Sequence, residues 1–336
     1  MILVTGATGL LGSRLIFDLA LAGKKVRALK RKTSRMNCVD FYFRSRPDLL
    51  SNIEWFDADL NDLYSLEESL QGITHVYHCA GKVSFQPRDK SAIHRTNADG
   101  TTNLVNLCLD RGIEKLCHVS SVAAIGRAET ENFNNEDTPW KSSKYNSTYA
   151  ISKYGAEREV WRGIAEGLNA VIANPGLIIG PGNWKTDSSM IFGQVWKGLS
   201  FYTDGVNGLV DVKDVTAAMI RLMESEISGE RFILVAENVP LREMMDRISD
   251  ALGKKRPSVH AGPVLTGFAW RVEYLKSLFT GAKPVITRET ASSAQNKSYF
   301  SNEKFTRAFN FEFGDIRKSI DETAAIFLQQ RSANHK

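Results

Sequence analysis

Tyr149 and Lys153, four residues apart, are the most chemically suggestive pair in the sequence. They lie in a segment with helical character, so both side chains project from one face of the expected helix. A lysine ammonium beside a phenol lowers the pKa of the phenol, which can then exchange a proton with a substrate oxygen near neutral pH. The same spacing is common in surface pairs that do no chemistry, so the neighbouring elements must decide between the two interpretations.

A pair of serines, Ser120 and Ser121, follows a short apolar run at 115–119 that predicts a strand. Ligands of parallel sheets bind at the carboxyl ends of the strands, where these hydroxyls would lie. A hydroxyl there can hydrogen-bond the same substrate oxygen and stabilise the charge that develops on it. The alternative is that the serines only cap a turn.

The first half of the chain alternates apolar strands with amphipathic helices, which indicates a parallel sheet covered on both faces. We expect strands at 1–5, 25–30, 53–57, 74–80, 115–120 and 169–174, and helices at about 11–22, 62–71, 93–111 and 148–166. After Pro175 the spacing becomes irregular, and a strand-helix unit at 208–223 is expected to return to the sheet.

The predicted fold class is therefore α/β, a Rossmann-type doubly wound parallel sheet with a smaller, mostly C-terminal α+β substrate domain. The expected dinucleotide-binding domain comprises residues 1–176 and about 206–236. The substrate-binding domain is expected at about 177–205 and 237–336.

A glycine-rich loop with the spacing G-x-x-G-x-x-G joins the first strand to the first helix. Glycines there allow a tight turn and let a pyrophosphate approach the helix N-terminus, where free N–H groups and the helix dipole favour negative charge. We predict that this loop binds a dinucleotide through Gly6, Thr8, Gly9, Leu10, Leu11 and Gly12. A plain structural turn is the alternative.

The basic run at 30–35 follows the second strand, and no acidic residue occurs between Lys24 and Cys38. An acidic side chain at this point would hold the ribose 2′-hydroxyl of NAD, whereas a basic one suits the 2′-phosphate of NADP. We therefore expect NADP, with Arg31 at the phosphate; NAD stays possible because loop length could place another residue on the ribose.

Further cofactor candidates lie at the ends of other strands. Asp57 and Asp59 end the third strand, where a carboxylate can accept from an adenine amino group or can cap the next helix. Small residues at the end of the fourth strand would let the cofactor lie close to the sheet, or would simply pack tightly. The remaining candidates for cofactor contact are Asp59, Leu60, Cys79, Ala80, Gly81, Lys153, Pro175 and Gly176.

Together these motifs resemble the extended short-chain dehydrogenase/reductase family: TGATGLLG at 5–12, HVSSVAAIG at 118–126 and YAISK at 149–153, in this order. The likeness extends over nearly the whole chain. It implies a catalytic serine, tyrosine and lysine, which the alignment of the serine motif assigns to Ser121, Tyr149 and Lys153. It also matches Asn97, within TNADGT at 96–101, to a family asparagine near the active site; a helix-interior hydrogen bond is the alternative.

Three further segments are similar to dihydroflavonol-reductase-like members of this family: VRALKR at 26–31, NPGLIIGPG at 174–182 and KPVITRET at 283–290. Nucleotide-sugar epimerases and dehydratases usually carry an arginine where this chain has Asn174. The resemblance therefore implies an NADP(H)-dependent reductase or dehydrogenase acting between a carbonyl and an alcohol. An epimerase or dehydratase with tightly bound NAD(P), and a nonenzymatic NADP-binding protein, remain alternatives. By family analogy, a homodimer could form through helices 93–111 and 148–166.

The composition indicates an ordinary globular protein, with 336 residues, a net charge of +5, 43% hydrophobic and 24% charged residues. Basic and acidic residues are interleaved, so we expect no nucleic-acid partner. The four cysteines form no close pair, and His75 and His78 point to opposite faces of a strand, so no metal is expected. We find no signal peptide and no apolar run long enough to cross a membrane, which predicts a cytoplasmic protein without stable membrane insertion.

The substrate is expected to be a small molecule, and aromatic and apolar residues in 176–204 suit a hydrophobic or ring-bearing one. The same residues would also serve as a small domain core; they are Trp184, Met190, Ile191, Phe192, Trp196, Phe201 and Tyr202. An apolar stripe follows at Leu265, Phe268, Val272, Leu275 and Phe279. We expect this stripe to pack on its own domain, with contact to a membrane surface as the alternative.

Overall fold

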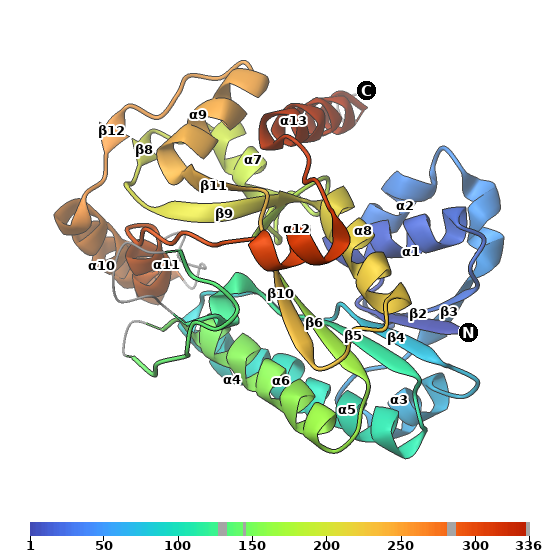
Figure 1. Ribbon diagram of the computed structural model, residues 1–336. Coiled ribbons are helices and arrows are strands. Elements are labelled where there is room, and N and C mark those ends of the chain that lie inside the picture. The colour runs from blue at the N-terminus through green and yellow to red at the C-terminus, as the bar shows by residue number, and fades with distance from the viewer. Residues whose placement is uncertain (127–132, 144–145, 281–286, 334–336) are drawn as a thin grey trace.

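A seven-stranded parallel sheet forms the centre of the computed structural model, which describes residues 1–126, 133–143, 146–280 and 287–333 (Figure 1). The strand order is β10-β6-β5-β4-β1-β2-β3. The strands are β1 (Ile2–Thr5), β2 (Val26–Lys30), β3 (Ile53–Asp57), β4 (His75–His78), β5 (Lys115–Val119), β6 (Ala170–Pro175) and β10 (Glu230–Leu234). The predicted fold class is thus confirmed, and all six strands expected in the first half are present.

Helices cover both faces of this sheet because successive strand residues alternate between two cores. Val4 belongs to a core with residues of α1, α2, α8 and α12, whereas its neighbour Leu3 belongs to a core with α3, α5 and α6. These helices are α1 (Leu10–Leu21), α2 (Asn37–Phe43), α8 (Val212–Glu224), α12 (Glu303–Phe309), α3 (Leu63–Ser69), α5 (Gly100–Asp110) and α6 (Thr148–Ala165).

Two regions of this half differ from the expected helices. Between β2 and β3, where no helix is expected, the chain forms α2 and the 3₁₀ helix η1 (Pro47–Asn52). The long helix expected at 93–111 is divided into α4 (Lys90–His94), a π-helical turn η3 (Arg95–Asp99) and α5. Short 3₁₀ turns η2 (Pro87–Asp89) and η4 (Val122–Ala124) complete the connections.

The strand at 208–212 does not return to the main sheet, so this expectation is wrong. It is part of β9 (Val206–Asp211), which pairs with β7 (Leu177–Ile179) and β11 (Glu237–Pro240) in a separate three-stranded sheet. The chain leaves the main sheet at the end of β6 and continues directly into β7. Because β9 pairs with β7, β9 lies in the small sheet and not in the main one. The position beside β6 is instead taken by β10, while α8 does pack on the main sheet.

The remaining elements pack around a third core that includes Phe192, Ile248 and Phe327. They include α7 (Met190–Trp196), α9 (Leu241–Ala251) and α13 (Ile316–Ala333), with β8 (Phe201–Tyr202) paired to β12 (Val259–His260) alongside. Of the aromatic residues expected in either a pocket or a core, Phe192 is fully buried in this core, and Trp184, Ile191 and Trp196 pack against it. Core packing therefore accounts for these four residues.

The apolar stripe on α10 (Pro263–Thr280) does not pack on its own domain, so that expectation is wrong for the side chains described. Leu265, Phe268, Val272 and Leu275 are all exposed. The helix itself packs against the short helix α11 (Arg288–Ser293) of the same part of the chain. The side chain of Phe279 and residues 283–286 of the resemblance noted above lie outside the described part of the chain.

Gly176, directly after β6, lies against the backbone of β9. A Cβ atom at this position would lie 2.3 Å from the carbonyl oxygen of Gly208. Neither backbone can move without separating the two sheets. We therefore expect Gly176→Ala to lower the free energy of unfolding by about 1–3 kcal/mol, measured by urea denaturation.

Gly155→Ala in α6 is the matched control, because its Cβ would lie at an ordinary 3.5 Å from Ala98 Cβ. A helical Gly→Ala change without a clash is expected to stabilise by up to ~1 kcal/mol. Equal effects of the two substitutions would contradict the proposed contact.

Candidate active site

The glycine loop turns tightly over the end of β4. Gly6 has a φ of +66°, and a Cβ there would lie 2.7 Å from the Cα of Ala80. At Gly12, a Cβ would lie 2.2 Å from the carbonyl oxygen of Gly6. Two of the three glycines are therefore required by the backbone itself, which brings the loop close to the predicted residues Cys79 and Ala80.

The N-terminus of α1 is well suited to an anion. Its N-cap residue, Gly9, offers no side-chain cap, and the first turn carries no acidic residue. Thr8 and Gly9 reach the surface, whereas Leu10 and Leu11 are buried beneath them. The free N–H groups and the positive end of the helix dipole are thus left for a negatively charged group, as a dinucleotide pyrophosphate requires.

The basic run after β2 divides into paired and unpaired cations. Lys30 pairs with Asp57, with 2.5 Å between Nζ and Oδ1. Arg31 is exposed and forms no ion pair with any described residue, and its backbone N–H donates to Ser34 Oγ at 3.0 Å. Arg31 is therefore available for a phosphate, whereas Lys30 is already neutralised.

The other predicted cofactor residues have structural contacts of their own. Asp59 Oδ1 accepts from the backbone N–H of Asn61 at 2.9 Å, a local turn contact, and it does not cap α3, whose N-cap residue is Asp62. Leu60 is buried against α5. A Cβ added at Gly100 would lie 2.8 Å from the Cβ of Leu60. Pro175 ends β6, and Gly176 contacts β9 as described.

Tyr149 and Ser121 lie together at the carboxyl edge of the sheet. Ser147 caps α6, so Tyr149 occupies its first turn, and Ser121 caps η4 by accepting from Ala123 N at 3.1 Å. Burial raises the pKa of Tyr149, and a hydrogen bond with Ser121 acts in the opposite direction. The ring of Phe85 meets the Tyr149 ring edge-on, with 6.0 Å between centroids.

Lys153 is 5% exposed and donates from Nζ to the carbonyl oxygen of Val119 at 2.7 Å. Burial lowers its pKa to about 8, while the negative charges of Glu157 and of an ionised Cys79 would oppose that shift. Lys153 is not among the groups that shift the pKa of Tyr149. The expected direct lowering is therefore not seen here, and the ammonium hydrogen-bonds to the end of β5 instead.

Asn97 lies on the π-helical turn η3 and is almost fully buried. Its Oδ1 accepts from Lys82 N at 2.7 Å, and its Nδ2 donates to Lys82 O at 3.0 Å and to Ser152 Oγ at 2.9 Å. A Cβ at Gly81 would lie 3.6 Å from both Asn97 Oδ1 and Lys153 Nζ. Asn97 thus joins the segment after β4 to the active-site helix.

Glu157 is a site residue that the sequence analysis missed. Its Oε1 accepts from Arg231 Nη1 at 2.8 Å, and its Oε2 accepts from Asn174 Nδ2 at 2.8 Å. Asn174 also donates to the backbone oxygen of Ser121 at 3.0 Å. The signal was available, because Glu157 follows Lys153 by four residues and so shares its helix face with Tyr149.

Two buried histidines lie below the site. His78 contacts Thr5 Oγ1 through Nδ1 at 2.7 Å and Thr101 Oγ1 through Nε2 at 3.0 Å. Burial, together with the charge of Lys153, lowers its pKa to about 3. His118, with its ring 5.0 Å from that of His78, has its pKa lowered by the same causes. Both rings are therefore neutral at physiological pH.

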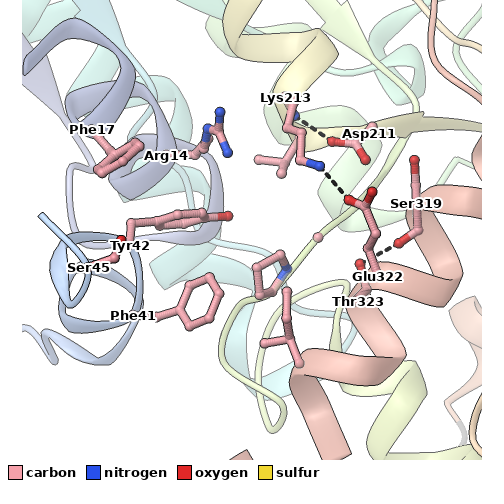
Figure 2. A pocket seen from close by; sticks show the side chains of 14 residues that line it. Arg14, Phe17, Phe41, Tyr42, Ser45, Asp211, Lys213, Ser319, Glu322 and Thr323 are labelled. Atoms are coloured by element: carbon pink, nitrogen blue, oxygen red, sulfur yellow. Dashed lines mark hydrogen bonds and ion pairs between the residues drawn. The ribbon is translucent and has the colours of Figure 1, made fainter. Parts of the chain in front are cut away.

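A cavity of about 260 Å³ lies elsewhere, where α1, α2, the start of α8 and α13 meet (Figure 2). Its charged groups already have partners: Lys213 pairs with Glu322, and Asp211 accepts from the backbone N–H of Lys213. None of the predicted site residues lines it. This cavity is therefore distinct from the group formed by Ser121, Tyr149 and Lys153.

The sequence of residues 2–234 matches the model of the NAD dependent epimerase/dehydratase family. The chain belongs to this family, the extended short-chain dehydrogenase/reductases, whose members are NAD(P)-dependent oxidoreductases, epimerases and dehydratases. The match includes the glycine loop, the serine and the tyrosine-lysine pair described above.

Among its relatives is a Synechocystis protein with the provisional name dihydroflavonol 4-reductase, which is 30% identical over 96% of this chain and 93% of its own length. Sterol demethylase protein B of Methylococcus capsulatus is 28% identical over 78% of each chain. The crystal structure of gox2253 has a TM-score of 0.82 and 29% identity, covering 98% of both chains. The chain is thus similar to reductases of the dihydroflavonol-reductase-like group.

Removing the Glu157 carboxylate should be strongly destabilising, because it is 1% exposed and would leave Arg231 without its counter-charge. We expect Glu157→Ala to lower the free energy of unfolding by about 3–5 kcal/mol in urea denaturation. Glu159→Ala, on the same helix, removes a half-exposed partner of Arg162 and should cost less than about 1 kcal/mol. A similar decrease in the free energy of unfolding for both variants would show that the buried Glu157–Arg231 pair stabilises the fold no more than a surface ion pair does.

Proposed function

We propose that this protein is an NADP(H)-dependent reductase that interconverts a carbonyl and an alcohol on a hydrophobic or ring-bearing small molecule. The observation that carries the proposal is the grouping of Ser121, Tyr149 and Lys153 at the carboxyl edge of the sheet. The glycine loop lies at the same edge, at the end of β1.

A nicotinamide cofactor bound at the glycine loop supplies or accepts the hydride. Its pyrophosphate would be held by the backbone of residues 8–12 at the start of α1, and its 2′-phosphate by Arg31. The uncapped helix end and the unpaired arginine fit these groups.

Tyr149 acts as the general acid during reduction, its hydroxyl donating a proton to the substrate oxygen. Ser121 orients that oxygen by donating a hydrogen bond to it, which stabilises the negative charge that develops during the reaction. In the opposite direction Tyr149 accepts the proton from the alcohol. Burial favours the protonated phenol, which is the form that reduction needs.

Lys153 is proposed to hold the nicotinamide ribose beside this proton transfer. At pH values below about 8 its ammonium is charged and can donate hydrogen bonds to the ribose hydroxyls. Its hydrogen bond to Val119 holds it at the end of β5, next to the serines. Asn97 positions α6 through Ser152 and is proposed to act through that contact.

The proposed substrate class is supported by the aromatic ring beside the proton donor and by the names of the relatives. Phe85 forms an apolar surface against Tyr149. The relatives are named for dihydroflavonols and sterols, both of which carry fused rings. We further propose a homodimer through the faces of α5 and α6, by analogy with the family.

The reductase proposal is tested by following NADPH oxidation at 340 nm with a panel of ring-bearing ketones and aldehydes. Tyr149→Phe is expected to lower kcat/KM at least about 100-fold, because the general acid is lost. Its affinity for NADPH should not change, since the phenol is not a phosphate ligand. Cofactor that co-purifies tightly, without net oxidation by any carbonyl, would favour the epimerase or dehydratase alternative.

Arg31→Ala should raise the Kd for NADPH about 10–100-fold and leave the Kd for NADH unchanged, since only NADPH has the 2′-phosphate. Both constants can be measured by fluorescence titration. Arg44→Ala is the control, because Arg44 is also exposed but lies at the far end of α2. An equal loss of NADPH and NADH binding would contradict the role given to Arg31.

A further inference from the structure

The outer face of α10 is apolar and open to solvent. We define this α10 face as Val264, Leu265, Phe268, Val272 and Leu275, which recur at helical spacing along one side. Val264 is 89% exposed, Phe268 66% and Leu275 54%. Large exposed apolar groups gathered on one side of a helix mark an interaction surface rather than scattered surface residues.

The opposite face of α10 is turned toward the protein and carries both polar and apolar side chains, among them the partly buried Ala269 and Trp270. Thr266 is buried there and donates to the carbonyl oxygen of Gly262 at 3.0 Å. The side chain of Glu273 is 23% exposed. An amphipathic surface helix normally presents its apolar side to the core and its polar side to water. In α10 the five large apolar side chains of the α10 face lie instead on the solvent side.

Two further apolar side chains are exposed on the small sheet that precedes α10 in the chain. Phe201 of β8 and Val259 of β12 are register partners and both are exposed. Val259 precedes the first residue of α10 by four positions, and Figure 1 shows the chain running from β12 directly into α10.

The charges on this surface are cationic. Arg271 is exposed at the edge of the α10 face, where it donates to the carbonyl oxygen of Gly267 at 2.7 Å and stacks on Trp270 with 4.7 Å to the ring centroid. Lys276 flanks the face with an exposed side chain and pairs with Glu273, with 3.7 Å between Nζ and Oε1. Glu273, which lies on the opposite side, is the sole acidic residue in the sequence of α10. The partner of this face should therefore be both apolar and anionic.

We propose that α10 lies on the surface of an anionic lipid bilayer, with the α10 face inserted among the lipids and Arg271 at the phosphate groups. A helix with an apolar side and flanking cations binds in this way without spanning the membrane. No helix in the described part of the chain is long and apolar enough to cross one.

A second copy of this chain fits the same face less well. In a two-fold pairing of α10 with itself, Arg271, near the middle of the helix, would approach Arg271 of the other copy. The α10 face offers no carboxylate to neutralise the two guanidinium groups, and unpaired charges are costly in an apolar interface. Lipid phosphates supply the missing negative charge.

Docking at α10 would bring the bilayer to the side of the protein where α6 begins. α10 packs against α11, and Glu289 of α11 accepts from Thr148 N at 3.1 Å and from Thr148 Oγ1 at 2.7 Å. Thr148 directly precedes Tyr149. The lipid contact itself does not depend on the proposed reaction.

The test is flotation of the purified full chain with vesicles of phosphatidylcholine, with and without phosphatidylserine. The wild type is expected to float with the phosphatidylserine vesicles. The double variant Phe268→Glu, Leu275→Glu should stay in the soluble fraction, and Arg271→Gln should bind roughly fivefold more weakly. Tyr64→Glu, at an exposed apolar position of α3, is the control and should float like the wild type.

Thermal unfolding of each variant shows whether it is folded, and these exposed substitutions should not change it. Three results would overturn the proposal. They are an absence of flotation with either vesicle, flotation that Phe268→Glu, Leu275→Glu does not reduce, and a wild-type oligomer in sedimentation that the double variant converts to monomer. The last result would make a second copy the occupant of the face.

Discussion

The buried carboxylate of Glu157 is the interaction on which the site depends. A negative charge in the interior must be neutralised and fully hydrogen-bonded, and here Arg231 of β10 and Asn174 of β6 do both. Because Asn174 also binds the backbone of Ser121, the ion pair fixes the end of β5 relative to α6. The positions of the serine and of the tyrosine-lysine pair are therefore set by one charge that touches neither Ser121 Oγ nor the Tyr149 ring.

The two histidines buried near Lys153 are uncharged. His78 and His118 lie at the ends of β4 and β5, and burial holds both rings neutral. The lysine is consequently the one cation among these three groups, and Glu157 on the same helix opposes the loss of its proton. A single positive charge in a poorly solvated place acts more strongly on a nearby oxygen than the same charge would in water.

Local sequence patterns were enough to predict the alternating sheet, the glycine loop and the helix that carries Tyr149 and Lys153. Contacts between distant residues were not predictable in this way: Arg231 and Glu157 are 74 positions apart. The pairing of β9 with β7, rather than with the main sheet, depends on where the chain turns at Gly176. For α10 the helical period was visible, but a period does not reveal which side of a helix faces the protein.

The strand that completes the main sheet is synthesised late. β10 begins at Glu230, whereas its neighbour β6 ends at Pro175, so more than fifty residues separate the two partners. Until β10 emerges from the ribosome, β6 is an open sheet edge and Glu157 lacks its arginine. For about a few seconds of translation the nascent chain therefore has an incomplete sheet whose unpaired edge can aggregate with other chains. Chaperone protection matters most during this period.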